Sequence, residues 1–188
     1  MTAFEWGDRL PTLLASRVAL RHIEPSDAAD LISVFSDQDA MGQWVSMQSL
    51  ADVDLFLQVN TLGLERRQLF CWGIADRTDN RIVGTCGLSS IDPRHYRGEV
   101  GFMLMPSRWG QGLAREAVTA VLAFAFNTLD LHRVEAFTLP SNSRAVALLK
   151  RMGFQQEGHL RQRYHVGGTH VDALAFGLLR SEWNQRTR

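Results

Sequence analysis

The segment that decides the fold is EVGFMLMPSRWGQGLAREA, residues 99–117. Its first part has the apolar character of a strand and is broken by Pro106. Its second part begins a helix that we expect to run from about Gly112 to Leu129 with one apolar face. Between them, Gly110 and Gly112 allow a sharp turn that presents bare backbone N–H groups. Such a nest at the positive end of a helix dipole is typical of a phosphate or pyrophosphate site.

Two well-known phosphate-binding loops do not match this spacing. A P-loop has a lysine followed by serine or threonine after its second glycine, whereas Leu113 and Ala114 follow Gly112 here. The dinucleotide fingerprint has three spaced glycines, and the third is missing. The loop therefore indicates a phosphate cradle of another kind, to which Arg108 and Arg115 would add charge-assisted contacts. By itself, such a turn also occurs as an ordinary connection without a ligand.

The rest of the chain alternates predicted strands and helices around this segment. The turn-rich residues 76–80 predict an antiparallel hairpin, and residues 103–139 predict a right-handed parallel crossover. Ser26 or Asp27 is expected to cap the first helix, and Gly153 to end the last one in a left-handed conformation. The expected strands are 17–23, 69–75, 81–89, 97–105, 132–139, 154–159 and 171–179, and the expected helices are 25–35, 49–65, 112–129 and 142–152.

The composition indicates one globular domain over residues 1–188, with residues 1–16 as an N-terminal arm lying on it. The formal net charge is zero, which implies no strong attraction to nucleic acid or to an anionic membrane. The N-terminus has no signal-peptide pattern and no apolar run reaches membrane-spanning length, so we expect a cytoplasmic protein. Cys71 and Cys86 lack metal-ligand spacing, and we expect reduced thiols and no metal.

Three motifs follow one another along the chain: residues 99–106, residues 108–117, and Asn142 with Ala145, Leu148 and Met152-Gly-Phe154. Together they resemble the GNAT acetyltransferases, and more narrowly the branch that contains the ribosomal-protein N-terminal acetyltransferases (RimJ/RimL-like). The resemblance runs from about Arg17 to Trp183. It implies an α/β (α+β) fold with a mixed, mostly antiparallel sheet of about seven strands and about four flanking helices. It also implies acetyl-CoA as the donor.

The resemblance implies where acetyl-CoA binds. Backbone N–H groups of the loop 109–115 would hold the pyrophosphate. The strand ending at Leu104 would splay from the strand that begins near Arg133, and pantetheine would pair with the backbone exposed between them. Asn142 would bond the pantetheine arm; asparagine is also a preferred helix N-cap, and both roles are compatible. The implied cofactor-binding residues are Phe102, Met103, Leu104, Arg108, Trp109, Gly110, Gln111, Gly112, Leu113, Ala114, Arg115 and Asn142.

Attack on a thioester requires a neutral amine, which a general base near the acceptor favours. Glu99 occupies the position where the family often has a glutamate that acts through water. The alternative interpretation is a surface carboxylate paired with a residue such as Arg97. Trp44 and Tyr164 lie in predicted loops that approach the acceptor site in this branch, and an aromatic residue that covers the edge of the core is the alternative for each.

The resemblance implies direct transfer within a ternary complex, with the N-terminal α-amino group of a protein or peptide as the acceptor. A small amine, such as a polyamine, an amino-acid derivative or an aminoglycoside, is the alternative acceptor. Leu149 and Ala145 replace a tyrosine and a serine of many relatives. The acid for the CoA thiolate is therefore unassigned, and a sensor that binds acyl-CoA without transfer stays open. Homodimers are common in this branch, although no apolar stripe seen in the sequence demands one.

Overall fold

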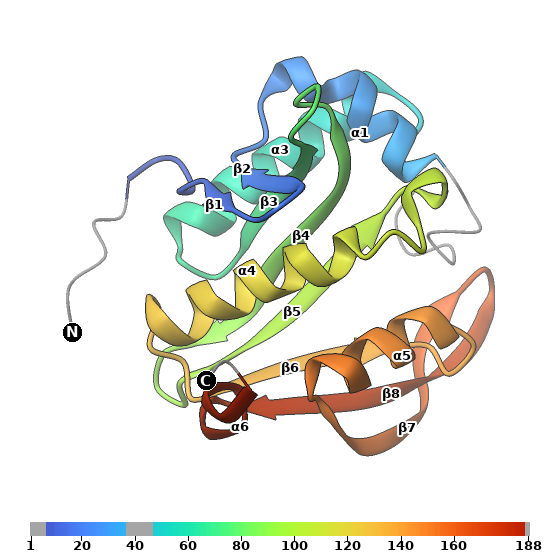
Figure 1. Ribbon diagram of the computed structural model, residues 1–188. Coiled ribbons are helices and arrows are strands. Elements are labelled where there is room, and N and C mark those ends of the chain that lie inside the picture. The colour runs from blue at the N-terminus through green and yellow to red at the C-terminus, as the bar shows by residue number, and fades with distance from the viewer. Residues whose placement is uncertain (1–6, 37–46, 187–188) are drawn as a thin grey trace.

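The computed structural model describes residues 7–36 and 47–186, which form one eight-stranded sheet with helices on both faces (Figure 1). Its strand order is β1-β2-β3-β4-β5-β6-β8-β7. The strands are β1 Leu13–Leu14, β2 Val18–Arg21, β3 Phe70–Asp76, β4 Ile82–Asp92, β5 Arg97–Leu104, β6 Arg133–Thr138, β7 Gln155–Val166 and β8 Thr169–Leu179. The helices are α1 Ala28–Phe35, α3 Leu50–Glu65, α4 Leu113–Asn127, α5 Ser143–Met152 and α6 Arg180–Arg186, with 3₁₀ turns at Pro25–Asp27 and Pro106–Arg108.

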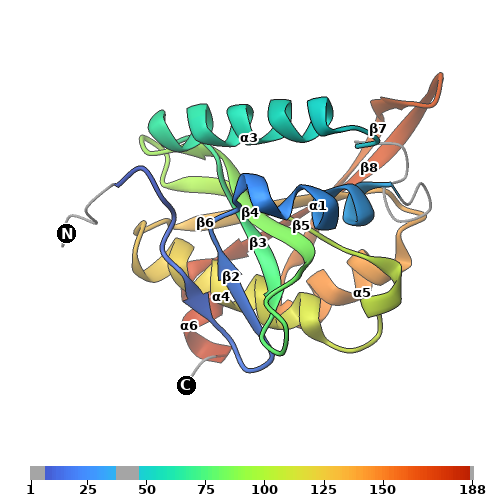
Figure 2. The ribbon, with the colours of Figure 1, turned by 90° about the horizontal axis from the view of Figure 1, so that it is seen from above.

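Helices α1 and α3 cover one face of the sheet, and α4, α5 and α6 cover the other (Figure 2). The α4 side holds the larger core, in which Leu104 of β5 and Val121 of α4 are buried. The α1 and α3 side holds a second core around Leu31 and Val53, and Met103 packs against it. Because side chains alternate along a strand, Leu104 and Met103 of β5 point into different cores.

Strands β5 and β6 form the parallel pair that the crossover predicted, but they pair over a short distance. The register joins Arg97–Glu99 to Arg133–Glu135 and then stops. Strand β6 goes on to Thr138 beside β8 instead. In Figure 1 the far ends of β5 and β6 diverge on the side where α4 begins. The predicted splay is therefore confirmed.

The predicted N-terminal arm contributes an eighth strand to the sheet. In β1, Leu13 pairs with Leu20 of β2. The indole Nε1 of Trp72 donates a hydrogen bond to the carbonyl of Pro11 at 2.8 Å, and Leu10 is buried in the larger core. These contacts fasten the arm to the sheet. A two-residue strand next to a proline shows no alternation from which it could have been predicted.

The segment 160–168 was expected to be a loop, and this expectation is wrong. Strand β7 continues to Val166, and β8 starts at Thr169. The turn between them is Gly167-Gly168, with φ angles of 56° and 79°. Most residues of β7 are exposed on both faces, so the sequence lacks the apolar alternation of a half-buried strand. Among the described residues, no helix is long and apolar enough to cross a membrane.

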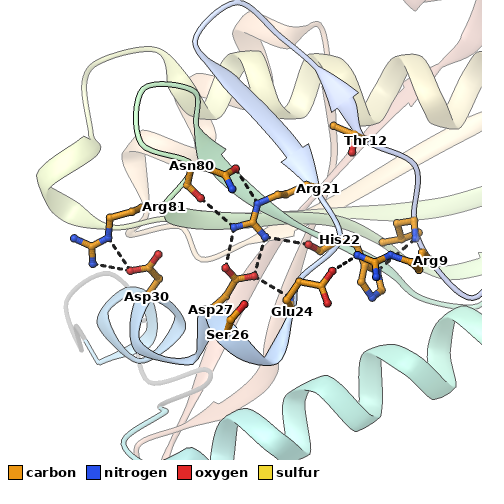
Figure 3. A pocket seen from close by; sticks show the side chains of 11 residues that line it. Arg9, Thr12, Arg21, His22, Glu24, Ser26, Asp27, Asp30, Asn80 and Arg81 are labelled. Atoms are coloured by element: carbon orange, nitrogen blue, oxygen red, sulfur yellow. Dashed lines mark hydrogen bonds and ion pairs between the residues drawn. The ribbon is translucent and has the colours of Figure 1, made fainter.

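A network of ion pairs joins β2, α1 and the β3–β4 turn around a polar cavity of about 470 Å³ (Figure 3). Arg21 donates to both carboxylate oxygens of Asp27 at 2.8 Å and to the backbone carbonyl of Asn80 at 3.0 Å. Arg81 pairs with Asp30 at 2.6 Å. Asp27 is the N-cap residue of α1, as one of the two expectations had it. Its carboxylate, however, accepts hydrogen bonds from Arg21 and from Glu24 N–H and makes no capping bond to the helix. The carboxylates that line this cavity, Glu24, Asp27 and Asp30, each pair with an arginine of the lining.

Candidate active site

The glycine turn between β5 and α4 forms the predicted nest of N–H groups. Gly110 and Gly112 have φ angles of 73° and 81°, in the left-handed region that favours glycine. The first hydrogen bond at this end of α4 runs from Glu116 N–H to Gly112 C=O at 3.2 Å, and no side chain caps the helix. The N–H groups of residues 113–115 therefore lack an acceptor within the described chain. A phosphate oxygen is the acceptor that such a nest fits.

Arg17, the residue before β2, brings a positive charge to the nest. Its Nε donates to Glu116 Oε1 at 2.7 Å, and its backbone N–H donates to Oε2 at 2.8 Å. Its Nη2 lies 3.3 Å from the point that a Cβ atom on Gly112 would occupy. A side chain at position 112 would thus crowd both the guanidinium and the nest. Sequence reasoning missed Arg17 because folding, and not sequence proximity, brings it to the N-terminus of α4.

Other side chains hold the loop in place. Arg108 pairs with Asp76 at the end of β3, with 2.9 Å between Nη2 and Oδ2, so its guanidinium ties the loop to the sheet. The indole Nε1 of Trp109 donates to the carbonyl of Leu104 at 2.7 Å. The guanidinium carbon of Arg144, at the start of α5, lies 4.5 Å from the centre of the Trp109 ring. Arg144 is a second cation near the loop that the sequence did not indicate.

The backbone of β5 offers hydrogen-bonding groups to the gap beside it. Met105 N–H donates to a carbonyl of β4 at 2.9 Å. In an antiparallel ladder, alternate residues of a strand bond the same neighbour, so Met103 also bonds β4. Phe102 and Leu104 lie between these residues and direct their N–H groups to the opposite edge of β5. That edge no longer pairs with β6 at this point. Two of the three predicted strand residues therefore present backbone to the gap. Pantetheine, an amide-containing chain, fits such an edge.

Asn142 begins α5 and is its N-cap. Its Oδ1 accepts a hydrogen bond from Ala145 N–H at 3.1 Å, and Gly153 closes the helix with a φ of 97°. Both predictions from the sequence are thereby confirmed. The amide nitrogen of Asn142 is exposed and bonds none of the residues that the structure describes. Its role toward pantetheine stays a prediction that this geometry permits.

Glu99 is the last residue of β5 that pairs with β6, and its side chain is half-buried. It shares the alternate set of Met103 and therefore faces the α1 and α3 side. Burial, and next the charge of Glu135 opposite it, raise the pKa of Glu99, while Arg163 opposes this shift. Arg97 pairs with Glu135 at 3.0 Å, so the alternative of a Glu99–Arg97 pair is wrong. Within residues 7–36 and 47–186, Glu99 makes no hydrogen bond or close ion pair.

Arg163 and Tyr164 of β7 reach the same place because the strand bulges. The register with β8 shifts just before Tyr164, and Gln162 has a φ of 51°. Gln162 N–H donates to Asp172 at 2.8 Å, which stabilises the bulge. The guanidinium carbon of Arg163 lies 5.9 Å from the Tyr164 ring centre. Burial, and next the charge of Glu99, raise the pKa of Tyr164. Tyr164 thus lies near enough to Glu99 to feel its charge, in a strand and not in the expected loop, and its place at the acceptor site stays a prediction.

Leu149 and Ala145, which replace a tyrosine and a serine of many relatives, have structural roles here. Leu149 is 1% exposed and packs in the larger core, so nothing at that position reaches the gap. Ala145 has no side-chain donor, and its N–H is taken by the helix cap. Trp44 lies outside the described residues, and its place at the acceptor site stays a prediction.

The Acetyltransferase (GNAT) domain family matches residues 17–155 of the chain. The uncharacterized N-acetyltransferase p20 of Bacillus licheniformis is 33% identical over 178 residues, which cover 93% of this chain and 99% of the relative. The [ribosomal protein uS5]-alanine N-acetyltransferase of Escherichia coli is 28% identical over 115 residues, covering 61% of this chain and 59% of that enzyme.

The fold is also similar to that of spermidine N-acetyltransferase from Vibrio cholerae, solved in complex with CoA and spermine. The TM-score is 0.78 at 22% identity, covering 89% of this chain and 98% of that one. The family match spans the nest, the splayed strands and Glu99. This chain therefore belongs to the GNAT acetyltransferase family and is an acetyl-CoA-dependent N-acetyltransferase.

Proposed function

We propose that the enzyme acetylates the N-terminal α-amino group of a protein or peptide. The charge around Glu99 carries this proposal. Glu135 is bonded by Arg97 at 3.0 Å and by Arg133 at 2.9 Å, and Arg133 also bonds Glu157. Among Glu99, Glu135 and Glu157, Glu99 is therefore the one carboxylate that has no bonded cation within the described part of the chain.

One uncompensated carboxylate suits an acceptor with one amine to be deprotonated. A polyamine has several ammonium groups, and its recognition would favour several free carboxylates. Exposed Arg163 on β7 adds positive charge beside Glu99, which disfavours a polycation. The E. coli relative is named for an alanine of ribosomal protein uS5, which agrees with a protein acceptor.

The residues at the gap would act as follows. The amine nitrogen forms a bond to the acetyl carbon, the carbon–sulfur bond breaks with its electron pair on sulfur, and the amine proton passes to Glu99, directly or through water. The N–H groups of Phe102 and Leu104 would donate to oxygens of the cofactor, and the nest at 110–115 would hold its pyrophosphate. With Leu149 buried, the thiolate takes its proton from solvent.

A thiol-release assay with acetyl-CoA tests the acceptor class. We expect CoA release with a short peptide that has a free, neutral N-terminal residue and an internal lysine. The matched control is the same peptide with a blocked N-terminus, which should give no release because only its lysine amine remains. Spermidine and an aminoglycoside complete the panel as small-amine acceptors. Turnover on either of these without turnover on the free peptide would replace the proposal with a small-molecule acetyltransferase.

A further inference from the structure

Two histidines face each other across the β7–β8 hairpin, next to its turn. His165 of β7 is the register partner of His170 of β8, and both residues are exposed. Their ring centres lie 4.9 Å apart, with 53° between the ring planes. Figure 2 shows this end of the hairpin extending past the helices that cover the sheet. We call His165 and His170 the hairpin histidine pair.

The turn between the strands sets the arrangement of this pair. Gly167 and Gly168 have φ angles of 56° and 79°, and two positive φ angles are what a type I′ turn requires in a two-residue hairpin. In such a hairpin Val166 and Thr169 form the hydrogen-bonded pair that closes the turn, and the histidines form the next, non-hydrogen-bonded pair. Side chains approach most closely in pairs of this second kind. The backbone therefore holds both imidazoles on one face of the hairpin at close range.

The separation of the two rings matches that of two ligands on one metal ion. An imidazole nitrogen binds Zn²⁺ at about 2.0–2.1 Å, which places the ring centre about 3.2 Å from the metal. Two imidazoles at octahedral to tetrahedral angles then have ring centres about 4.5–5.2 Å apart. The observed 4.9 Å lies within this range. The folded hairpin thus gives the pair a chelating separation, which the positions of the two residues in the sequence do not reveal.

The donor groups nearest to the pair are engaged elsewhere. Asp172 follows His170 by two residues on β8, but its carboxylate contacts His159 Nε2 at 2.6 Å and accepts a hydrogen bond from Gln162 N–H at 2.8 Å. Within residues 7–36 and 47–186, no group of three or more His, Cys, Asp or Glu side chains could hold a metal ion. An ion on the hairpin histidine pair would therefore complete its coordination with water.

We propose that the hairpin histidine pair is a bidentate site for a divalent transition-metal ion that favours imidazole, the class of Zn²⁺, Ni²⁺ and Cu²⁺. Because its two ligands belong to neighbouring strands, the ion links β7 to β8 beside the turn. It thereby restrains the part of β7 that carries Tyr164. This inference depends neither on the acceptor of the enzyme nor on the role of Glu99.

Calorimetric titration of Zn²⁺ into the full chain, prepared without a histidine tag, tests the site. We expect one ion per chain, bound on the order of 100-fold more tightly than by His165→Gln or His170→Gln, because each variant keeps only one ligand of the chelate. His95→Gln removes another exposed histidine, in the β4–β5 connection, and is the matched control. It should bind Zn²⁺ as wild type does.

The native cysteines do not compete for the metal in this experiment. Burial raises the pKa of the Cys71 thiol to about 12 and raises that of Cys86 further. Since the thiolate is the form of cysteine that binds metals, neither residue offers a ligand at neutral pH.

Cu²⁺ and hydrogen exchange provide independent readouts. Pulsed EPR with one equivalent of Cu²⁺ should report two coordinated imidazoles in wild type and one in His170→Gln. With Zn²⁺ bound, the amides of residues 164–171 should exchange more slowly in wild type and not in His170→Gln.

Four results would each overturn the proposal. These are a wild-type Zn²⁺ affinity equal to that of His170→Gln, an equal loss of affinity in His95→Gln, a single imidazole on Cu²⁺ in wild type, and hydrogen exchange of the hairpin that ignores Zn²⁺. Circular dichroism checks that the variants are folded.

Discussion

Glu99, the proposed general base, is held in its place at some expense of stability. Its carboxylate is half-buried, faces the like charge of Glu135 across the β5–β6 register, and makes no hydrogen bond with the described residues. Burial is the first cause of its raised pKa, and Glu135 is the second. The charged form of such a carboxyl group is less favourable in the folded protein than in the unfolded chain.

Replacement of Glu99 by glutamine should therefore stabilise the protein. A carboxyl whose folded pKa is raised contributes stability below its unfolded pKa and loses it as the pH rises through the folded pKa. The gain from Glu99→Gln should accordingly be larger at pH 7 than at pH 4, as measured by chemical denaturation at both values. Glu116→Gln is a contrasting variant, because bonds from Arg17 help to lower the pKa of Glu116. That variant should lose stability at pH 7.

At the scale of elements, the turn from β5 into α4 should control cofactor binding. Gly112→Val places a β-branched side chain at a φ of 81° and within 3.3 Å of Arg17 Nη2. We expect acetyl-CoA to bind on the order of 10- to 100-fold more weakly, because the hydrogen bonds of the nest to a charged group are lost. Calorimetric titration measures this change directly.

Gly168→Val is the matched control for the effect of backbone strain. Gly168 has a φ of 79° with no atom within 4 Å of an added Cβ, and it lies in the β7–β8 turn, outside the nest. Both substitutions should cost about 1–2 kcal/mol of stability through the left-handed backbone. If Gly168→Val weakened acetyl-CoA binding as much as Gly112→Val, the assignment of the pyrophosphate to the nest would be lost.

The elements with a strong local signal could be predicted from sequence. Gly110 and Gly112 marked the nest, Asn142 and Gly153 marked the ends of α5, and apolar alternation marked the central strands. Strand β7 escaped prediction because its exposed faces lack a period of two. For the same reason Tyr164 was expected in a loop, and the bulge that brings it to Glu99 was not foreseen.

At the scale of the whole molecule, positive charge on the β7–β8 hairpin should decide between acceptors. Arg163→Glu reverses an exposed charge beside Glu99 and should raise kcat/KM for spermidine relative to a neutral peptide, on the order of tenfold at low salt. Arg94→Glu, an exposed change in the β4–β5 connection, should leave this ratio unchanged. An Arg163→Glu enzyme with the wild-type ratio at low salt would mean that the hairpin does not select the acceptor.

Contacts between distant parts of the chain were beyond the reach of sequence reasoning. The overall topology followed from the order of predicted elements, including the crossover that separates β5 from β6. Arg17 at the nest and Arg163 at Glu99 depend on which strands become neighbours, and no local pattern encodes this. The exposure of Leu55, Val59 and Leu62 on α3 was also missed, because an apolar residue on a predicted helix does not reveal which face the sheet will bury.

The most direct test of the account is the pH dependence of kcat/KM for wild type and Glu99→Gln with the preferred acceptor. For wild type we predict an acidic limb governed by a carboxyl whose pKa lies above that of an ordinary glutamate. In Glu99→Gln this limb should vanish, and the rate should fall on the order of 100-fold while acetyl-CoA still binds with wild-type affinity. An unchanged rate and an unchanged limb in the variant would show that Glu99 is not the base and that the chemistry is placed wrongly.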